Sequence, residues 1–323
     1  MSSSIVKQLS DFLDASPTAY HAVDNIAAAL EAAGVVRLHE TEAWKIEPGC
    51  AYFVSRSGSA LIAFRAGLRP PAEEGFAIAG GHTDSPALKL RLEKSLVSRG
   101  MDRASVEVYG GPIISTWLDR PLSLAGRVVI RGKSGAPETR LVNFARPIGV
   151  IPNLAIHLNR DVNNGFEYNA QNHLPVLLSS RGKEEGAEQD LGRETRPAAS
   201  EPGQDVASPF SHPFPGAMRR LLAEELAIDG GDLLAGDLFF VDAQKAVILG
   251  SDPELINAYR LDDLTACHAI LSAFLATPPT AHGQVACFLD HEEVGSRSTR
   301  GADSSFLRDT LARIASLQGT NTD

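Results

Sequence analysis

Cysteine is scarce in this sequence: three residues, Cys50, Cys267 and Cys287, occur among 323, and no two have CxxC spacing. An odd and widely spaced set argues against a disulfide framework and against a zinc site built on thiolates. Cys267 and Cys287 lie within apolar runs, so we expect them to be small buried residues. Any metal chemistry would therefore depend on histidine and carboxylate ligands.

Positive charge is also in short supply. The 30 lysines and arginines are outnumbered by 40 acidic residues, which gives a net charge of −10. With no basic patch, nucleic acid and anionic membranes are unfavourable partners. Residues 1–17 carry acids and contain no long apolar stretch, so they predict neither a signal peptide nor a membrane span. We expect a cytoplasmic protein.

The size and composition are those of an ordinary globular enzyme with about two domains. Two helical patterns open the chain, and the second has Ser16 as its predicted N-cap and Pro17 at its first helical position. Strand-like runs follow at 51–56, 60–67 and 75–82. The last run is apolar until it ends in two glycines and His82, as a central strand of a covered sheet would be.

The middle of the chain differs in character. Residues 91–231 contain short runs punctuated by glycine and proline, which predict β-strands with tight turns in a separate module. Within them, residues 181–208 have almost no large apolar side chains and predict a solvated or disordered excursion.

The α/β pattern returns in the last third of the sequence. Residues 237–250 predict two strands joined by a turn, 261–276 a helix and 283–290 a buried strand. The predicted fold class is therefore α/β. Residues 1–90 and 232–323 would form one catalytic domain around a single sheet, interrupted by a β-rich insert, 91–231.

Polar residues gather where apolar strands are predicted to end. His82 and Asp84 end one strand and Glu292 and Glu293 follow another, at the edge where open α/β sheets bind ligands. Asp262 opens the predicted helix. Taken singly, each has an ordinary explanation: a structural histidine, a helix cap, a solvated surface pair. Their joint occurrence favours a metal site.

A neutral imidazole with several carboxylates is the ligand set of paired zinc or manganese sites in hydrolases. Asp84 would accept the second ring N–H of His82 and so fix its tautomer. One glutamate would bind metal while its neighbour moves protons, because a ligand and a general base approach the same water from different directions.

Several longer motifs carry a resemblance to a known family. They are "FLDASPTAYHAV", "GGHTDSPALKL", "YGGPIISTWLDRPLSLAGRV", "IPNLAIHLNRDVN", "YRLDDL" and "DHEEVGSRSTRGADS". In this order they resemble the aspartyl aminopeptidases, a family of dinuclear zinc metallopeptidases. The resemblance implies a zinc-peptidase sheet with flanking helices, interrupted by a β-rich oligomerisation domain. It also implies a hydrolase that removes N-terminal residues, acidic ones among them, from peptides by metal-activated water.

The resemblance assigns roles residue by residue. His82 becomes a ligand of one Zn²⁺, Asp262 the bridging carboxylate and Glu293 a ligand of the second Zn²⁺, with Mn²⁺ or Co²⁺ as substitutes. Glu292 becomes the general base, and Asp84 the partner of His82.

Two further implications concern assembly. The insert would build a closed homo-oligomer, of which a dodecamer is one form. From the insert, His157 would reach into the active site of a neighbouring subunit and help to stabilise the tetrahedral intermediate. Asp263 and His291 depart from the family pattern, which usually has asparagine at both positions.

The family also implies one more ligand for each metal, an aspartate in a D-x-AHA context and a late histidine, and this sequence contains neither motif. We therefore expect the 323-residue chain by itself to bind zinc weakly and to show little peptidase activity, unless His291, Asp290 or Asp263 replaces the missing ligands. Two alternatives stay open: a truncated, catalytically silent form acting through fold and oligomer contacts, and a related amidohydrolase for non-peptide amides.

Overall fold

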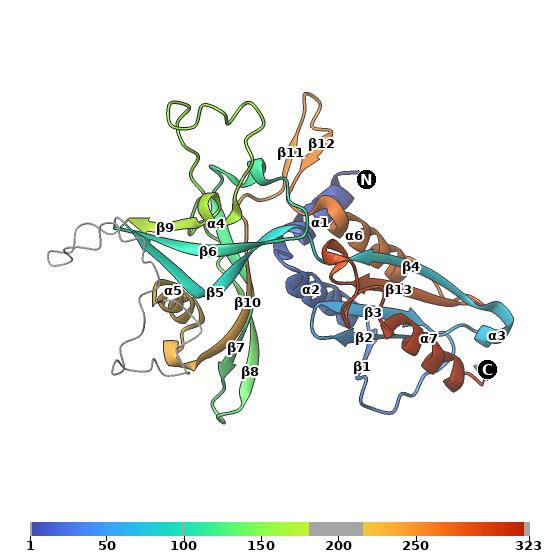
Figure 1. Cartoon of the computed structure of the whole chain (residues 1–323). Coiled ribbons are helices and arrows are strands. Elements are labelled where there is room, and N and C mark those ends of the chain that lie inside the picture. The colour runs from blue at the N-terminus through green and yellow to red at the C-terminus, as the bar shows by residue number, and fades with distance from the viewer. Residues whose placement is uncertain (1, 99, 181–215, 320–323) are drawn as a thin grey trace.

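The structure is a computed structural model and describes residues 2–98, 100–180 and 216–319. Two large β-sheets of different character dominate the described residues (Figure 1). The first sheet contains both parallel and antiparallel pairs, and helices pack on it. The second is antiparallel throughout the described residues.

The first sheet joins the two ends of the sequence. Its late strand lies between two early ones, antiparallel to one and parallel to the other, so both parts of the chain share one sheet, as predicted. The strand order is β1 (Val36–Leu38), β2 (Ala51–Arg56), β3 (Ala60–Arg65), β13 (Gly283–Leu289) and β4 (Phe76–His82).

Helices pack on both faces of this sheet. Its edge strand β4 is nevertheless exposed from Ala77 to Gly80, so the prediction of a central, covered strand at 75–82 was wrong. The helices α1 (Ser2–Ala15), α2 (Ala19–Ala32) and α6 (Leu261–Ala276) contribute to a core with Phe53 and Phe288, while α7 (Phe306–Leu317) packs against Phe64 on the other face. Alternate strand residues supply the two cores, as the period of a strand requires. Cys267 and Cys287 are buried in them, which confirms that prediction. Among the described helices, none is both long and apolar enough to cross a membrane.

The predicted N-cap of α2 is wrong by two residues. The helix begins after Thr18, whose backbone is extended and whose hydroxyl lies 2.9 Å from Nδ1 of His21. Ser16 instead accepts a hydrogen bond from the Asn25 side chain at 3.0 Å. Ser16 therefore lies before the helix and is hydrogen-bonded by a side chain from its second turn.

The second sheet has the strand order β8 (Pro137–Asn143), β7 (Leu122–Arg131), β10 (Leu233–Asp242), β5 (Ala87–Ser98), β6 (Met101–Tyr109) and β9 (Val176–Ser180). Its core contains Leu88, Leu124 and Phe240. The short helices α3 (Pro71–Glu74), α4 (Ala170–His173) and α5 (Gly216–Leu226) complete the α-helical elements of the described residues, and 3₁₀ turns lie at Ile114–Trp117, Gly230–Asp232 and Glu292–Val294.

The strands of this sheet extend beyond the predicted insert, 91–231, at both ends. The strand β5 begins at Ala87, and β10 pairs along its length with β7, with Asp242 opposite Leu122. The assignment of β10 to the catalytic sheet was wrong, because its buried Leu238 and Phe240 complete the core of the second sheet.

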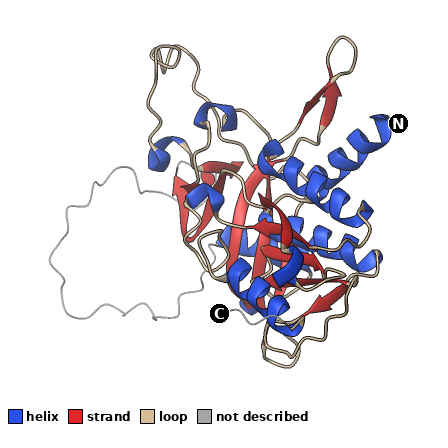
Figure 2. Cartoon of the chain, turned by 90° about the vertical axis from the view of Figure 1, so that its right-hand side faces the viewer, coloured by secondary structure: helices blue, strands red, loops and turns tan. Residues whose placement is uncertain are grey.

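The other strand predicted in 237–250 pairs elsewhere. It is β11 (Val247–Leu249), which forms a hairpin with β12 (Leu255–Asn257). Figure 2 shows this hairpin projecting beside the amino-terminal helix. The predicted excursion at 181–208 lies outside the described residues.

Candidate metal centre

Two strand ends bring the predicted site residues together. The strands β4 and β13 run parallel, and Leu289 lies directly opposite His82. Parallel strands end at the same edge of a sheet, so His82 and the residues that follow β13 meet there. This confirms the position predicted from the apolar runs.

The two glutamates lie on a 3₁₀ turn, Glu292–Val294, immediately beyond β13. Left-handed residues flank the turn: His291 at φ 63° and Gly295 at φ 92°, a conformation that favours glycine at the second position. Because the acids lie on a turn and not on the strand, their carboxylates need not point to opposite faces. Both reach the neighbourhood of His82, as expected.

The start of α6 supplies two more carboxylates. Asp262 and Asp263 have non-helical backbone angles, and the peptide bond between them is cis. Ser85 donates a hydrogen bond to the backbone carbonyl of Asp262 at 3.0 Å, and the carboxylate of Asp263 accepts the backbone N–H of His82 at 3.1 Å. These bonds attach the helix start to the end of β4.

His82 is the common member of two candidate metal-binding groups. One group contains Asp262 and Asp263 and the other Glu292 and Glu293, with ligand atoms within 4.8 Å of one another in each. The Nε2 atom of His82 lies 3.2 Å from Asp262 Oδ1 and 3.9 Å from Glu292 Oε2. Among the described residues, Asp262 and Glu293 share no such group, so the predicted ligands gather around one histidine.

The ring of His82 is oriented by Asp84. Nδ1 lies 3.0 Å from the backbone carbonyl oxygen of Asp84 and 3.4 Å from its carboxylate, so we assign the Nδ1 proton to these acceptors and leave Nε2 facing Asp262. Burial lowers the pKa of His82, but the hydrogen bond and charge of Asp84, then the charge of Asp263, raise it to about 9. The site therefore favours positive charge at Nε2, from a proton or a metal ion.

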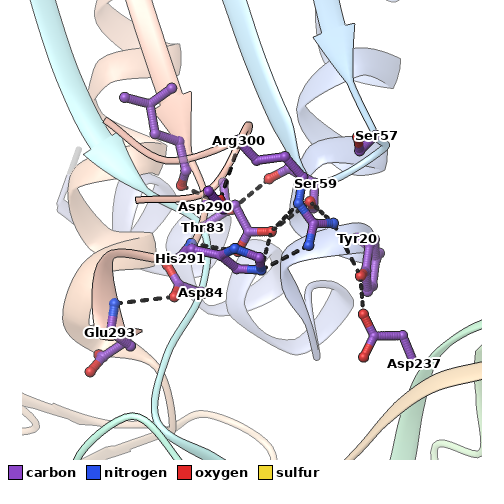
Figure 3. A network of polar contacts seen from close by, with 12 residues as sticks. Tyr20, Ser57, Ser59, Thr83, Asp84, Asp237, Asp290, His291, Glu293 and Arg300 are labelled. Atoms are coloured by element: carbon purple, nitrogen blue, oxygen red, sulfur yellow. Dashed lines mark hydrogen bonds and ion pairs between the residues drawn. The ribbon is translucent and has the colours of Figure 1, made fainter. Parts of the chain in front are cut away.

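Asp84 also holds the glutamate turn. Its two carboxylate oxygens accept the backbone N–H groups of Glu292 and Glu293, each at 3.2 Å, and Tyr109 donates its hydroxyl hydrogen to the carboxylate at 2.7 Å. Figure 3 shows the bond from Glu293. Burial alone would raise the pKa of Asp84, but the hydrogen bonds from His82, Tyr109 and the Glu293 amide bring it below its usual value. The sequence predicted the contact with His82 and missed those with the turn and Tyr109.

A second polar network lies behind the turn and engages two of the proposed substitute ligands (Figure 3). Asp290, with 3% of its surface exposed, accepts hydrogen bonds from the Ser59 hydroxyl at 2.6 Å and from the His291 amide at 2.8 Å. Arg300 donates to Ser59 at 3.0 Å and lies 2.8 Å from Nε2 of His291. Asp290 and His291 thus contact Ser59 and Arg300 instead of the candidate groups, which leaves Asp263 as the substitute that lies beside His82.

His157 lies apart from these groups in the described chain. It is exposed on the long loop between β8 and α4, and the described hydrogen bonds, ion pairs and metal-binding groups do not join it to His82. Its role in a neighbouring subunit stays a prediction.

The donor atoms and charges fit a divalent cation. An imidazole nitrogen and carboxylate oxygens are the ligands that zinc takes in hydrolases. Burial, then the charge of Asp84, with further contributions from Glu292 and Asp262, raises the pKa of Glu293. This crowding of negative charge is what a bound cation would relieve.

Comparisons with known proteins agree with this chemistry. The family model described as "Aminopeptidase I zinc metalloprotease (M18)" matches residues 12–323. The chain is 42% identical over 310 residues to "Probable M18 family aminopeptidase 2" of Azotobacter vinelandii, covering 95% of this chain and 65% of that relative. The chain thus spans just under two thirds of the length of this relative.

Solved structures share the fold. The mApe1 of Chaetomium thermophilum is similar with a TM-score of 0.83 at 28% identity, covering 97% of this chain and 68% of that one. The S. cerevisiae mApe1 dodecamer is similar with a TM-score of 0.78 at 25% identity, covering 99% of this chain and 67% of that one. The chain belongs to the M18 family of aminopeptidase I zinc metalloproteases.

Proposed function

We propose that the protein is a metal-dependent aminopeptidase that hydrolyses the first peptide bond of peptide substrates, acidic N-terminal residues among them. The observation that carries the proposal is the environment of His82. Its Nε2 atom faces Asp262 at 3.2 Å and Glu292 at 3.9 Å, while its other ring nitrogen is occupied by Asp84. Membership of a zinc metalloprotease family supports the same chemistry.

The arrangement supports His82 and Asp262 as ligands of one metal, and the resemblance to the family supplies the pairing of Asp262 with Glu293 at a second. His82 and Asp262 would hold one Zn²⁺, and Asp262 and Glu293 a second, with Mn²⁺ or Co²⁺ as substitutes that accept the same nitrogen and oxygen ligands. When bound, such ions polarise the scissile carbonyl and lower the pKa of water. Asp263, in the same candidate group as His82 and Asp262, fixes the end of β4 through the His82 amide.

Glu292 is suited to proton transfer. Its side chain is 58% exposed and its backbone N–H is held by Asp84, so the carboxylate is free to move while its attachment point is fixed. We assign to it the removal of a proton from the attacking water. The water oxygen bonds to the carbonyl carbon, the C–N bond breaks, and Glu292 returns the proton to the leaving amine.

Self-association is a further part of the proposal. One structural relative is described as a dodecamer, and we propose that this chain also forms a closed homo-oligomer through the β-rich insert, 91–231. Exposed apolar side chains on the loop that carries His157 support an interface there: Leu154, Ile156 and Leu158. An enclosed chamber would admit short peptides, and His157 would help to stabilise the tetrahedral intermediate in the active site of a neighbouring subunit. The free cysteines support a cytoplasmic location.

Metal depletion and reloading test the function most simply. The protein expressed from its complete reading frame, called the full-length protein below, is stripped with a chelator, reloaded with Zn²⁺, Mn²⁺ or Co²⁺, and assayed on aspartyl and leucyl substrates. We expect hydrolysis to disappear and return with the metal. Glu292→Gln should retain the metal while turnover falls at least about a hundredfold, whereas Glu73→Gln, an exposed glutamate on α3, should behave as wild type.

Two results would contradict the proposal. Unchanged turnover in Glu292→Gln would remove this residue from the mechanism. A metal-loaded protein that hydrolyses neither substrate would favour the catalytically silent alternative.

A further inference from the structure

The carboxylate of Asp84 is a contact point between the two sheets. Asp84 follows β4 of the first sheet, and Tyr109 is the last residue of β6 in the second. We propose that Tyr109 is a positioning residue, whose hydroxyl fixes the Asp84 carboxylate in the orientation that receives the backbone amides of Glu292 and Glu293. The effect of this positioning on catalysis rests on the proposed function. Its effect on the position of the turn Glu292–Val294 is independent of that function.

The hydrogen-bond lengths support this role. Asp84 Oδ2 accepts the Tyr109 hydroxyl at 2.7 Å and the Glu293 amide at 3.2 Å, while Oδ1 accepts the Glu292 amide at 3.2 Å. A short O–H bond to a carboxylate is among the stronger hydrogen bonds, whereas amide bonds at 3.2 Å lie at the long end of their range. The hydroxyl therefore provides the firmest of these three attachments.

Rotation of the Asp84 carboxylate is what the hydroxyl opposes. The terminal torsion of an aspartate is soft, because a carboxylate turns about its last bond over a broad range. The hydrogen bonds from the Glu292 and Glu293 amides form only when Oδ1 and Oδ2 of Asp84 both face the glutamate turn. Without the Tyr109 hydroxyl at Oδ2, the carboxylate would be held on that side only by the two long amide bonds and by its 3.4 Å contact with His82.

Tyr109 is itself held by the second sheet. Its ring packs edge-on against Phe239 of β10, with ring centroids 5.5 Å apart, and lies 6.3 Å from the ring of His291. The hydroxyl is thus presented from a strand end whose neighbours are fixed by the antiparallel ladder. By this path the second sheet would determine where the general base and one metal ligand lie.

A variant that removes only the hydroxyl tests the inference. Tyr109→Phe keeps the ring and its packing, so the fold should persist. Tyr52→Phe is a matched control, because Tyr52 also packs on an aromatic ring, that of Phe64, and its hydroxyl accepts the Glu47 amide at 2.9 Å on the first sheet. Any general cost of losing a tyrosine hydroxyl should appear in both variants.

The first readout is amide hydrogen exchange at Glu292 and Glu293 in the full-length protein. We expect faster exchange at these two amides in Tyr109→Phe and wild-type exchange in Tyr52→Phe. The second readout is steady-state kinetics. We expect kcat to fall about tenfold to a hundredfold in Tyr109→Phe, the usual cost of losing a group that orients metal ligands. KM should be unchanged, because the general base acts after the substrate binds.

The outcomes separate the inference from the proposed function. Wild-type exchange at both amides in Tyr109→Phe, or equal acceleration in both variants, would overturn the positioning role. Faster exchange with an unchanged kcat would overturn its catalytic consequence. If the wild-type protein hydrolyses no peptide while exchange accelerates only in Tyr109→Phe, the proposed function fails and the control of the turn by Tyr109 stands.

Discussion

Replacing Gly110 with alanine should displace Glu293 while leaving the fold intact. Gly110 follows β6 with a φ of 70°, and a methyl group built on it would lie 3.0 Å from Glu293 Cβ and 3.1 Å from its Oε2. Ordinary contact between such atoms begins near 3.4 Å, so Glu293 must retreat by about 0.4 Å (3.4 minus 3.0). The retreat moves a predicted metal ligand and the turn that carries the general base.

The size of the effect follows from these distances. A misplacement of about 1 Å in an active site costs about a hundredfold in rate, so 0.4 Å should lower kcat on the order of fivefold to tenfold. Alanine in the left-handed conformation lowers the free energy of unfolding by about 1–2 kcal/mol. The smaller entropy of the unfolded chain that carries alanine in place of glycine raises it by about 0.4–1 kcal/mol. The net loss of stability should be about 1 kcal/mol.

Gly111→Ala is the matched control, because a methyl group there has no atom within 4 Å and the backbone is not left-handed. The assays are kcat, zinc affinity by chelator competition, and thermal unfolding of the full-length protein. We expect weaker zinc binding and slower turnover in Gly110→Ala alone. Equal kcat and equal zinc affinity in the two variants would refute the contact between this strand end and Glu293.

Two further predictions concern stability and assembly. Burial, then the charge of Arg260, lowers the pKa of His21 from 6.5 to about 4. Between these two pH values His21 is protonated in the unfolded chain and neutral in the folded one. Stability should therefore fall as the pH drops from 6.5 towards 4, by up to about 3 kcal/mol at roughly 1.4 kcal/mol per unit. His21→Gln should flatten this part of the pH profile in urea unfolding, and an identical slope in both proteins would contradict it. Light scattering at micromolar concentration should detect a closed homo-oligomer of the full-length protein, and a strictly monomeric species would count against the proposed interface.

The first sheet was predictable because its signals are local. Apolar runs that end in polar residues mark β4 and β13 as strands, and their pairing places His82 opposite Leu289. The apolar pattern did not show that β4 is the exposed edge strand of the sheet and only β13 a covered one. The sheet to which each strand belongs could not be predicted from such local signals. The alternating large side chains of β10, Leu238 and Phe240, suit either sheet, and only tertiary packing assigns them to the second.

The sequence predicted which side chains gather at the site and did not predict the residues that support them. His82, Asp262 and the glutamate pair stand at strand or helix ends, where sequence patterns can be read. Ser59 and Asp290, by contrast, are hydrogen-bonded across a separation of 231 residues, and no local pattern marks a serine as the partner of a distant aspartate. The same holds for Tyr109, which a quoted motif contained without suggesting its partner.

Anomalous diffraction at the zinc absorption edge, from crystals of the full-length protein, tests the proposed metal centre most directly. We predict two zinc peaks, one bound by His82 Nε2 and Asp262 and the other by Asp262 and Glu293, with Glu292 coordinating neither ion. Zinc bound directly by Glu292, or no peak beside His82 in protein grown with zinc, would contradict the proposed assignment.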